Sequence, residues 1–204
     1  EYIVASEKIL FEGDGYSEAW EKEAEKRGLP NVKTAPLALD SMVTKKAKAL
    51  FENNDVYTHA ELEARHEIEL EKYIKKVQIE SRIMGELATS HILPAAIRYQ
   101  NMLANNIKGL KEAGMKESAF ANQLQILEKI SEHINLLSDL VEKMIEARKV
   151  CNNMDSTRTK AIAYCSQVKE AFFDQIRYHV DKLELLVDDK EWYLPKYREM
   201  LFLR

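Results

Sequence analysis

Helix-breaking residues are scarce over most of this chain. The 129 residues of Thr58–Leu186 contain one proline, Pro94, and three glycines, Gly85, Gly109 and Gly114. Inside a helix, proline costs roughly 3 kcal/mol and glycine about 1 kcal/mol relative to alanine. The scarcity of both therefore predicts long helices that fold back on one another.

Cysteines and long apolar runs are also few. Cys151 and Cys165 are the only cysteines, and a turn expected near Met154 places Cys151 opposite Thr157 rather than Cys165. We expect two free thiols, as in a reducing cytoplasm.

No apolar run approaches the 18–20 residues of a membrane span, and the sequence has no signal peptide, so we expect no membrane partner. The chain opens at Glu1 without an initiator methionine, and we expect a piece of a longer protein.

Charge of one sign does not dominate either. The chain has 30 basic and 34 acidic residues and a net charge of −4. The one tight basic cluster, Lys45, Lys46 and Lys48, has no interleaved aromatic residues. We interpret it as a solvated helix face, and we expect no nucleic-acid partner.

The apolar pattern predicts an all-α fold. Thr58 and Glu61 form a capping box that begins a helix through about Lys108, roughly 75 Å long, which Pro94 kinks without ending. The region from Gly109 to Gly114 is the predicted hinge. A second long helix begins near Lys116 or Ser118 and ends at Asn152–Asp155, and a third begins at Ser156 or Thr157 and ends at Asp188–Asp189. Three such helices with short connections form an antiparallel bundle, with at least two-thirds of the residues helical.

The sequence divides into three regions. Residues 1–57 are short helices and loops, in which Ser17 caps a helix that ends at Gly28. Residues 58–187 are the long-helix bundle. Residues 188–204 are a docking segment whose short helix begins at Pro195 and packs on the bundle through apolar side chains between Trp192 and Phe202.

No group of residues in the sequence indicates an active site. Glu63 and His66 have the Glu-x-x-His spacing of a di-iron bundle, but His59, His91, His133 and His179 lack a glutamate three residues earlier. His91 fits a core or semi-core position, and Asp188–Asp189 fits a helix stop. Gly13-Asp14-Gly15 is too short for a phosphate-binding loop, and neither cysteine has an adjacent histidine. We predict no catalytic, cofactor-binding or metal-binding residue.

Three segments carry a family resemblance. They are Phe11–Trp20 with Arg27–Asn31, Ile92–Tyr99 within the first long helix, and Leu186–Phe202 at the end. Together they resemble the C-terminal region of the type III glutamine synthetases, the large bacterial form, over essentially the whole chain. Tyr193 departs from the family, in which we expect proline at this position.

The resemblance implies a parent enzyme that joins ammonia to glutamate with ATP and divalent metal, Mg or Mn. Its active sites would lie between neighbouring subunits of a ring-shaped homo-oligomer, and its metal, nucleotide and flap residues would precede Glu1. This chain would then be a structural domain that packs against the upstream catalytic domain and neighbouring subunits. Two alternatives remain: a free-standing helical-bundle interaction or adaptor module, and a metal-binding bundle.

Overall fold

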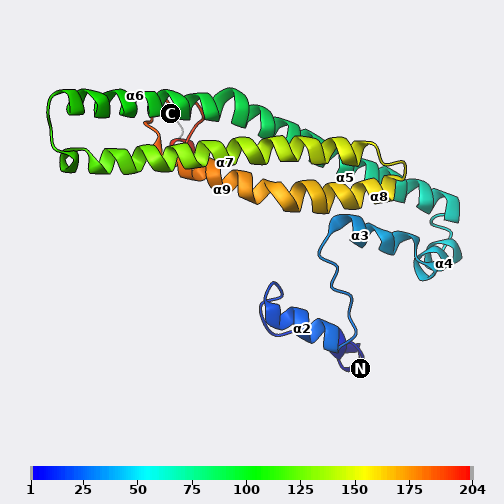
Figure 1. Ribbon diagram of the computed structural model, residues 1–204. Helices are drawn as coiled ribbons and strands as arrows, with labels where there is room; N and C mark the ends of the chain where they lie inside the picture. The colour runs from blue at the N-terminus through cyan, green and yellow to red at the C-terminus, as the bar shows by residue number, and fades with distance from the viewer. Residues whose placement is uncertain (1, 203–204) are drawn as a thin grey trace. The chain divides into compact units, whose positions relative to one another are not determined.

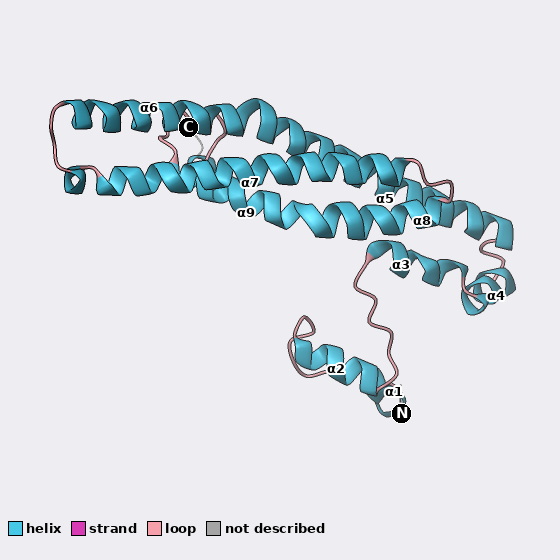
Figure 2. Cartoon of the chain, in the orientation of Figure 1, coloured by secondary structure: helices cyan, strands magenta, loops and turns pink. Residues whose placement is uncertain are grey.

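The computed structural model describes residues 2–202, and these are helical or irregular with no strand among them (Figure 2). Helices account for 78% of the residues, which confirms the predicted all-α fold and the two-thirds threshold. The chain divides into two compact units, residues 1–66 and residues 67–204. The division falls inside a helix, a little beyond the boundary expected at residues 57 and 58.

The first unit consists of short helices. Their bounds are α1 (Tyr2–Ala5), η1 (Glu7–Ile9), α2 (Glu18–Lys26), α3 (Ala35–Leu39), η2 (Asp40–Val43), α4 (Lys45–Asn53) and the first turns of α5 (His59–Leu87). As predicted, the Ser17 hydroxyl caps α2 by accepting from the Trp20 amide. Gly28 follows α2 with a φ of +69°, a left-handed conformation that glycine adopts without steric cost.

The second unit is a bundle of three long helices (Figure 1). The first continues from α5 through the π-helical turn η3 (Ala88–Ile92) into α6 (Leu93–Glu112). The second is α7 (Ala121–Asn152), preceded by the short η4 (Glu117–Ala119). The third joins α8 (Thr157–Ala163), the π-helical turn η5 (Tyr164–Lys169) and α9 (Glu170–Leu186). The helices alternate in direction, α6 packs against α7 and α7 against α9, as the sequence predicts.

The predicted apolar faces form the core of this bundle. Fully buried side chains come from all three helices, and they include Leu70, Val77, Ala88, Ile130, Leu137, Val141, Met144, Tyr164, Val168, Ile176 and Leu183. At about 25 cal/mol per Å² of apolar surface removed from water, this burial is the main source of the bundle's stability. No single helix could bury its own stripe, so the three depend on one another.

Pro94 is accommodated by the π-helical turn that precedes it. The Leu93 amide donates to the Ala88 carbonyl, five residues back, and Pro94 lies in the first turn of α6. A π-helical turn re-routes the backbone hydrogen bonds where proline lacks a donor. The first helix therefore passes through Pro94 without ending, as predicted.

The connection after the first long helix is shorter than predicted. Gly109 lies within α6, which continues to Glu112, so the assignment of Gly109 to the hinge is wrong. Of Gly109 and Gly114, only Gly114 has a positive φ, +76°, and it makes the turn. The reason is that an isolated glycine costs a helix only about 1 kcal/mol, which neighbouring turns outweigh.

Candidate functional site

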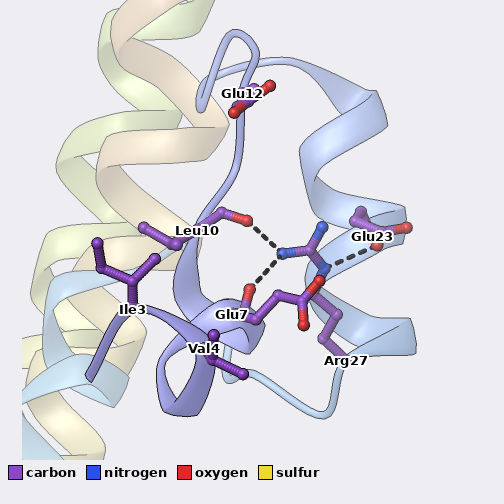
Figure 3. Close-up of a pocket in the computed structure, with 7 residues that line it drawn as sticks. All are labelled: Ile3, Val4, Glu7, Leu10, Glu12, Glu23 and Arg27. Carbon is purple, nitrogen blue, oxygen red and sulfur yellow. Dashed lines mark hydrogen bonds and ion pairs between the residues drawn. The ribbon is translucent and has the colours of Figure 1, made fainter. Parts of the chain in front are cut away.

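The hollow in the first unit is built around Arg27 (Figure 3). Its guanidinium forms an ion pair with Glu23, 2.7 Å between Nε and Oε1, and donates from Nη1 to the Leu10 carbonyl. Ile3, Val4, Glu7 and Glu12 line the rest of a hollow of about 770 Å³. Arg27 thus ties α2 to the preceding loop, and its hydrogen bond holds the pKa of Glu23 below its usual range.

The two residues of the Glu-x-x-His spacing bind side chains of the short helices. Glu63 pairs with Lys48 of α4, and that hydrogen bond lowers the pKa of the Glu63 carboxyl. His66 Nε2 lies 3.3 Å from Asp40 Oδ1 in η2, close enough for an ion pair when the ring is protonated. Within the part of the chain that the structure describes, no group of three or more His, Cys, Asp or Glu side chains is placed to hold a metal ion.

The cysteines are free and buried. Cys151 lies in α7 and Cys165 in the π-helical turn η5. Burial raises the pKa of both thiols, which favours the protonated, unreactive form. Both therefore act as core side chains.

Two histidines 46 residues apart in the chain, His133 and His179, meet between α7 and α9. His133 Nδ1 and His179 Nδ1 are 2.9 Å apart, so one ring donates to the other. Burial lowers the pKa of His179, and the neighbouring His133 lowers it further. At least one of the two rings must be neutral to keep this bond, because two imidazolium rings have no acceptor nitrogen.

An apolar groove runs between α5 and α9, with a volume of about 540 Å³. Ile79, Ile83 and Met84 form one wall, and Phe173 and Val180 form the other. Ile79 and Ile83 remain 58% and 50% exposed, which is unusual for isoleucines next to a well-packed core. Three charged side chains also line the groove: Glu80, Lys169 and Arg177.

The first residues of the C-terminal segment pack against the bundle. Trp192 is 8% exposed, Leu194 lines the end of the groove, and Tyr193 stacks on His91 with 5.2 Å between ring centroids. Arg98 Nε pairs with Glu191 at 2.8 Å. The short helix α10 (Tyr197–Met200) starts after Lys196, two residues later than the predicted Pro195.

The end of this segment keeps its apolar side chains in solvent. Met200, Leu201 and Phe202 are all more than half exposed. The ring and apolar contacts of the segment with the bundle are therefore made by Trp192, Tyr193 and Leu194, not by the whole apolar run.

The structure also shows the contacts of Asp188 and Asp189, the predicted helix stop. The Asp188 carboxylate accepts from the Lys190 amide, and Asp189 binds the Lys196 ammonium group. These contacts turn the chain at the end of α9. Each carboxylate thus has a structural partner.

Comparison with known proteins identifies the family. A family model described as the glutamine synthetase C-terminal domain matches residues 1–111, more than half of the chain. This chain belongs to the glutamine synthetase C-terminal domain family. The match confirms the resemblance seen in the sequence.

Curated relatives cover nearly the whole chain. It is 44% identical to a glutamine synthetase of Bacteroides fragilis and 31% identical to a type-3 glutamine synthetase of Dictyostelium discoideum, in each case over 99% of this chain. A glutamine synthetase of Butyrivibrio fibrisolvens is also 31% identical. The chain spans only 28% of the first two relatives and 29% of the third. The similarity therefore extends through the C-terminal segment, beyond residues 1–111.

No helix among the described residues is both long enough and apolar enough to cross a membrane.

Proposed function

We propose that this chain is the helical C-terminal part of a type III glutamine synthetase and that its role there is structural. The complete enzyme would join ammonia to glutamate with ATP and Mg or Mn, in the cytoplasm, as a ring-shaped homo-oligomer. The observation that supports this most strongly is the match to relatives of which the chain spans 28%. The catalytic, nucleotide and metal residues would then lie in the part of the enzyme outside this chain.

The groove between α5 and α9 is the surface that we propose for packing against the rest of the enzyme. A monomeric domain gains little from leaving Ile79 and Ile83 half exposed beside its core, because each buried isoleucine stabilises by about 1.5–3 kcal/mol. Most of the parent's length lies outside this chain and is available to cover these side chains. Because Glu80, Lys169 and Arg177 line the groove together with its apolar side chains, it fits a partner surface that has both apolar and polar groups.

A pair of substitutions in the full-length enzyme tests this role. Ile83→Asp places a charge in the groove, and we expect the assembled oligomer and the synthetase activity to fall at least tenfold. Leu185→Asp is the matched control, because Leu185 lies on α9, is 80% exposed and does not line the groove. If Ile83→Asp assembles and turns over as well as Leu185→Asp does, the groove is not the packing surface.

The isolated chain tests the other half of the proposal. Incubated with glutamate, ammonia, ATP and Mg²⁺, it is expected to form no glutamine. Turnover above the background of a heat-denatured sample would mean that this chain holds an active site.

A further inference from the structure

Two arginines face each other across the pair formed by α5 and α7. The register is fixed on one side by Gln78, whose Nε2 donates to Asn152 Oδ1 at 2.8 Å. On the other side, Gly85 faces Met144, whose Cε would lie 3.7 Å from a Cβ added to that glycine. Arg82 lies one turn after Gln78 on α5, and Arg148 lies one turn before Asn152 on α7, the helix that runs in the opposite direction. The two guanidinium groups are therefore neighbours.

Neither arginine has an acidic partner among the described residues. The ion pairs in this part of the chain involve neither Arg82 nor Arg148, although Glu86 stands one turn further along α5. Arg148 Nε is buried and makes no hydrogen bond. A guanidinium group that is partly withdrawn from water normally has a carboxylate, because an unpaired buried charge is costly.

The surroundings of Arg148 disfavour the positive charge of its guanidinium group. Burial lowers the pKa of its guanidinium, and the charge of Arg82 lowers it further. The Tyr164 hydroxyl, which also donates to Asn152 Oδ1 at 2.6 Å, offsets these effects in part. An anion between the two arginines would neutralise their repulsion and accept hydrogen bonds from the outer N–H groups of both guanidinium groups.

We propose that Arg82 and Arg148 form a binding site for a small oxyanion, either a phosphate group or a carboxylate. The planar guanidinium fork donates two parallel hydrogen bonds to either group, and two forks on facing helices can hold one anion from both sides. Arg82 is exposed and Arg148 is half-buried, so an anion reaches both guanidinium groups from solvent. This site is separate from the α5–α9 groove, and it does not depend on the proposed function.

Nuclear magnetic resonance of the arginine Nε–Hε groups tests the site directly. The chain is titrated with inorganic phosphate in one series and with glutamate in another, with sodium chloride adjusted to keep the ionic strength constant. We expect the Arg148 Nε–Hε signal to shift and saturate in at least one series. The series in which it saturates identifies the class of anion that binds. Absence of saturation in both series would overturn the proposal.

Three variants separate a built site from general attraction of anions to a basic surface. Arg82→Gln and Arg148→Met should each weaken binding at least tenfold. Lys149→Gln removes the same charge from the next residue of α7, whose side chain pairs with Glu146, and should change binding less than twofold. Because Arg82 is exposed, Arg82→Gln keeps the fold and decides the matter even if Arg148→Met does not fold. Equal binding by Arg82→Gln and the unchanged chain would contradict the proposal.

Discussion

The two units of this chain are stabilised by different kinds of contact. In residues 67–202 the long helices bury a continuous set of apolar side chains, and Ile130, Leu137 and Ile176 are completely inaccessible. In residues 2–66 few side chains are buried, and the helices depend on local contacts such as the Ser17 cap and the Arg27–Glu23 pair. Local contacts of this kind contribute about 1 kcal/mol each or less. The bundle can therefore be stable alone, whereas the first unit is the part that gains most from a partner.

Removing core volume should show the largest difference between the units. Leu137→Ala is expected to lower the free energy of unfolding by about 2–5 kcal/mol, because it opens a cavity in the bundle. Leu10→Ala in the first unit should cost less than about 0.5 kcal/mol, because Leu10 is exposed. Urea unfolding followed by circular dichroism measures both. Equal losses would mean that the two units do not differ as described.

The C-terminal segment offers the same contrast over a short distance. Trp192→Ala should lower the stability of the bundle by about 2 kcal/mol, because Trp192 is buried where the segment meets the helices. Phe202→Ala should have almost no effect, because Phe202 is 75% exposed.

Deleting residues 191–204 should lower the melting temperature by several degrees, like Trp192→Ala. An unchanged melt after the deletion would show that the segment does not stabilise the bundle.

The histidine pair should make the bundle more sensitive to acid than the first unit. The pKa of His179 is lower in the folded chain than in the unfolded chain, so the unfolded chain binds more protons at acidic pH. Stability should therefore fall as the pH drops below the unfolded value of about 6.5, and be unaffected above it. On protonation His179 would be a cation beside His133, with Glu132 as the nearby acid and Tyr178 packed on both rings.

Substitution of the pair checks this dependence. His179→Gln should flatten the change in melting temperature between pH 7.5 and pH 5.5. His59→Gln is the control, because His59 is an exposed residue of the first unit next to Glu52. If both variants keep the slope of the unchanged chain, the His133–His179 bond is not the acid-sensitive contact.

Gly109 within α6 and Gly114 in the connection after it should give small effects of opposite sign. Gly109→Ala is expected to stabilise by about 0.5–1 kcal/mol, because Gly109 is inside a helix and an added Cβ meets no atom within 4 Å. Gly114→Ala should destabilise by about 1 kcal/mol, because its φ of +76° is strained for alanine. Thermal unfolding of both variants distinguishes them. A stabilising Gly114→Ala would contradict the turn seen here.

The features predicted correctly from the sequence are those that depend on nearby residues. The Thr58–Glu61 capping box forms as expected, with the Glu61 carboxylate 2.8 Å from the Thr58 amide nitrogen, and the Ser156 cap forms likewise. The apolar faces were predictable because the 3.6-residue period repeats over many turns. Gly109 was misassigned because a glycine alone does not end a helix.

Contacts between helices were not predictable from the same sequence. His133 meets His179, and Gln78 meets Asn152, only because the register between helices places them opposite each other. The π-helical turn at Tyr164–Lys169 likewise has no local signal such as proline, and it arises where Tyr164 and Cys165 are buried in the core. A pattern within one helix contains no information on the register of its neighbour.

The most direct test of the account is the accessibility of the α5–α9 groove in the full-length enzyme. Ile83→Cys and Leu185→Cys are prepared in both the isolated chain and the full-length enzyme, and the rate of thiol alkylation at each position is measured by peptide mass spectrometry. If the groove packs against the rest of the enzyme, Ile83→Cys reacts at least tenfold more slowly in the full-length enzyme, while Leu185→Cys reacts at the same rate in both. Equal rates for Ile83→Cys in the two proteins would contradict the account.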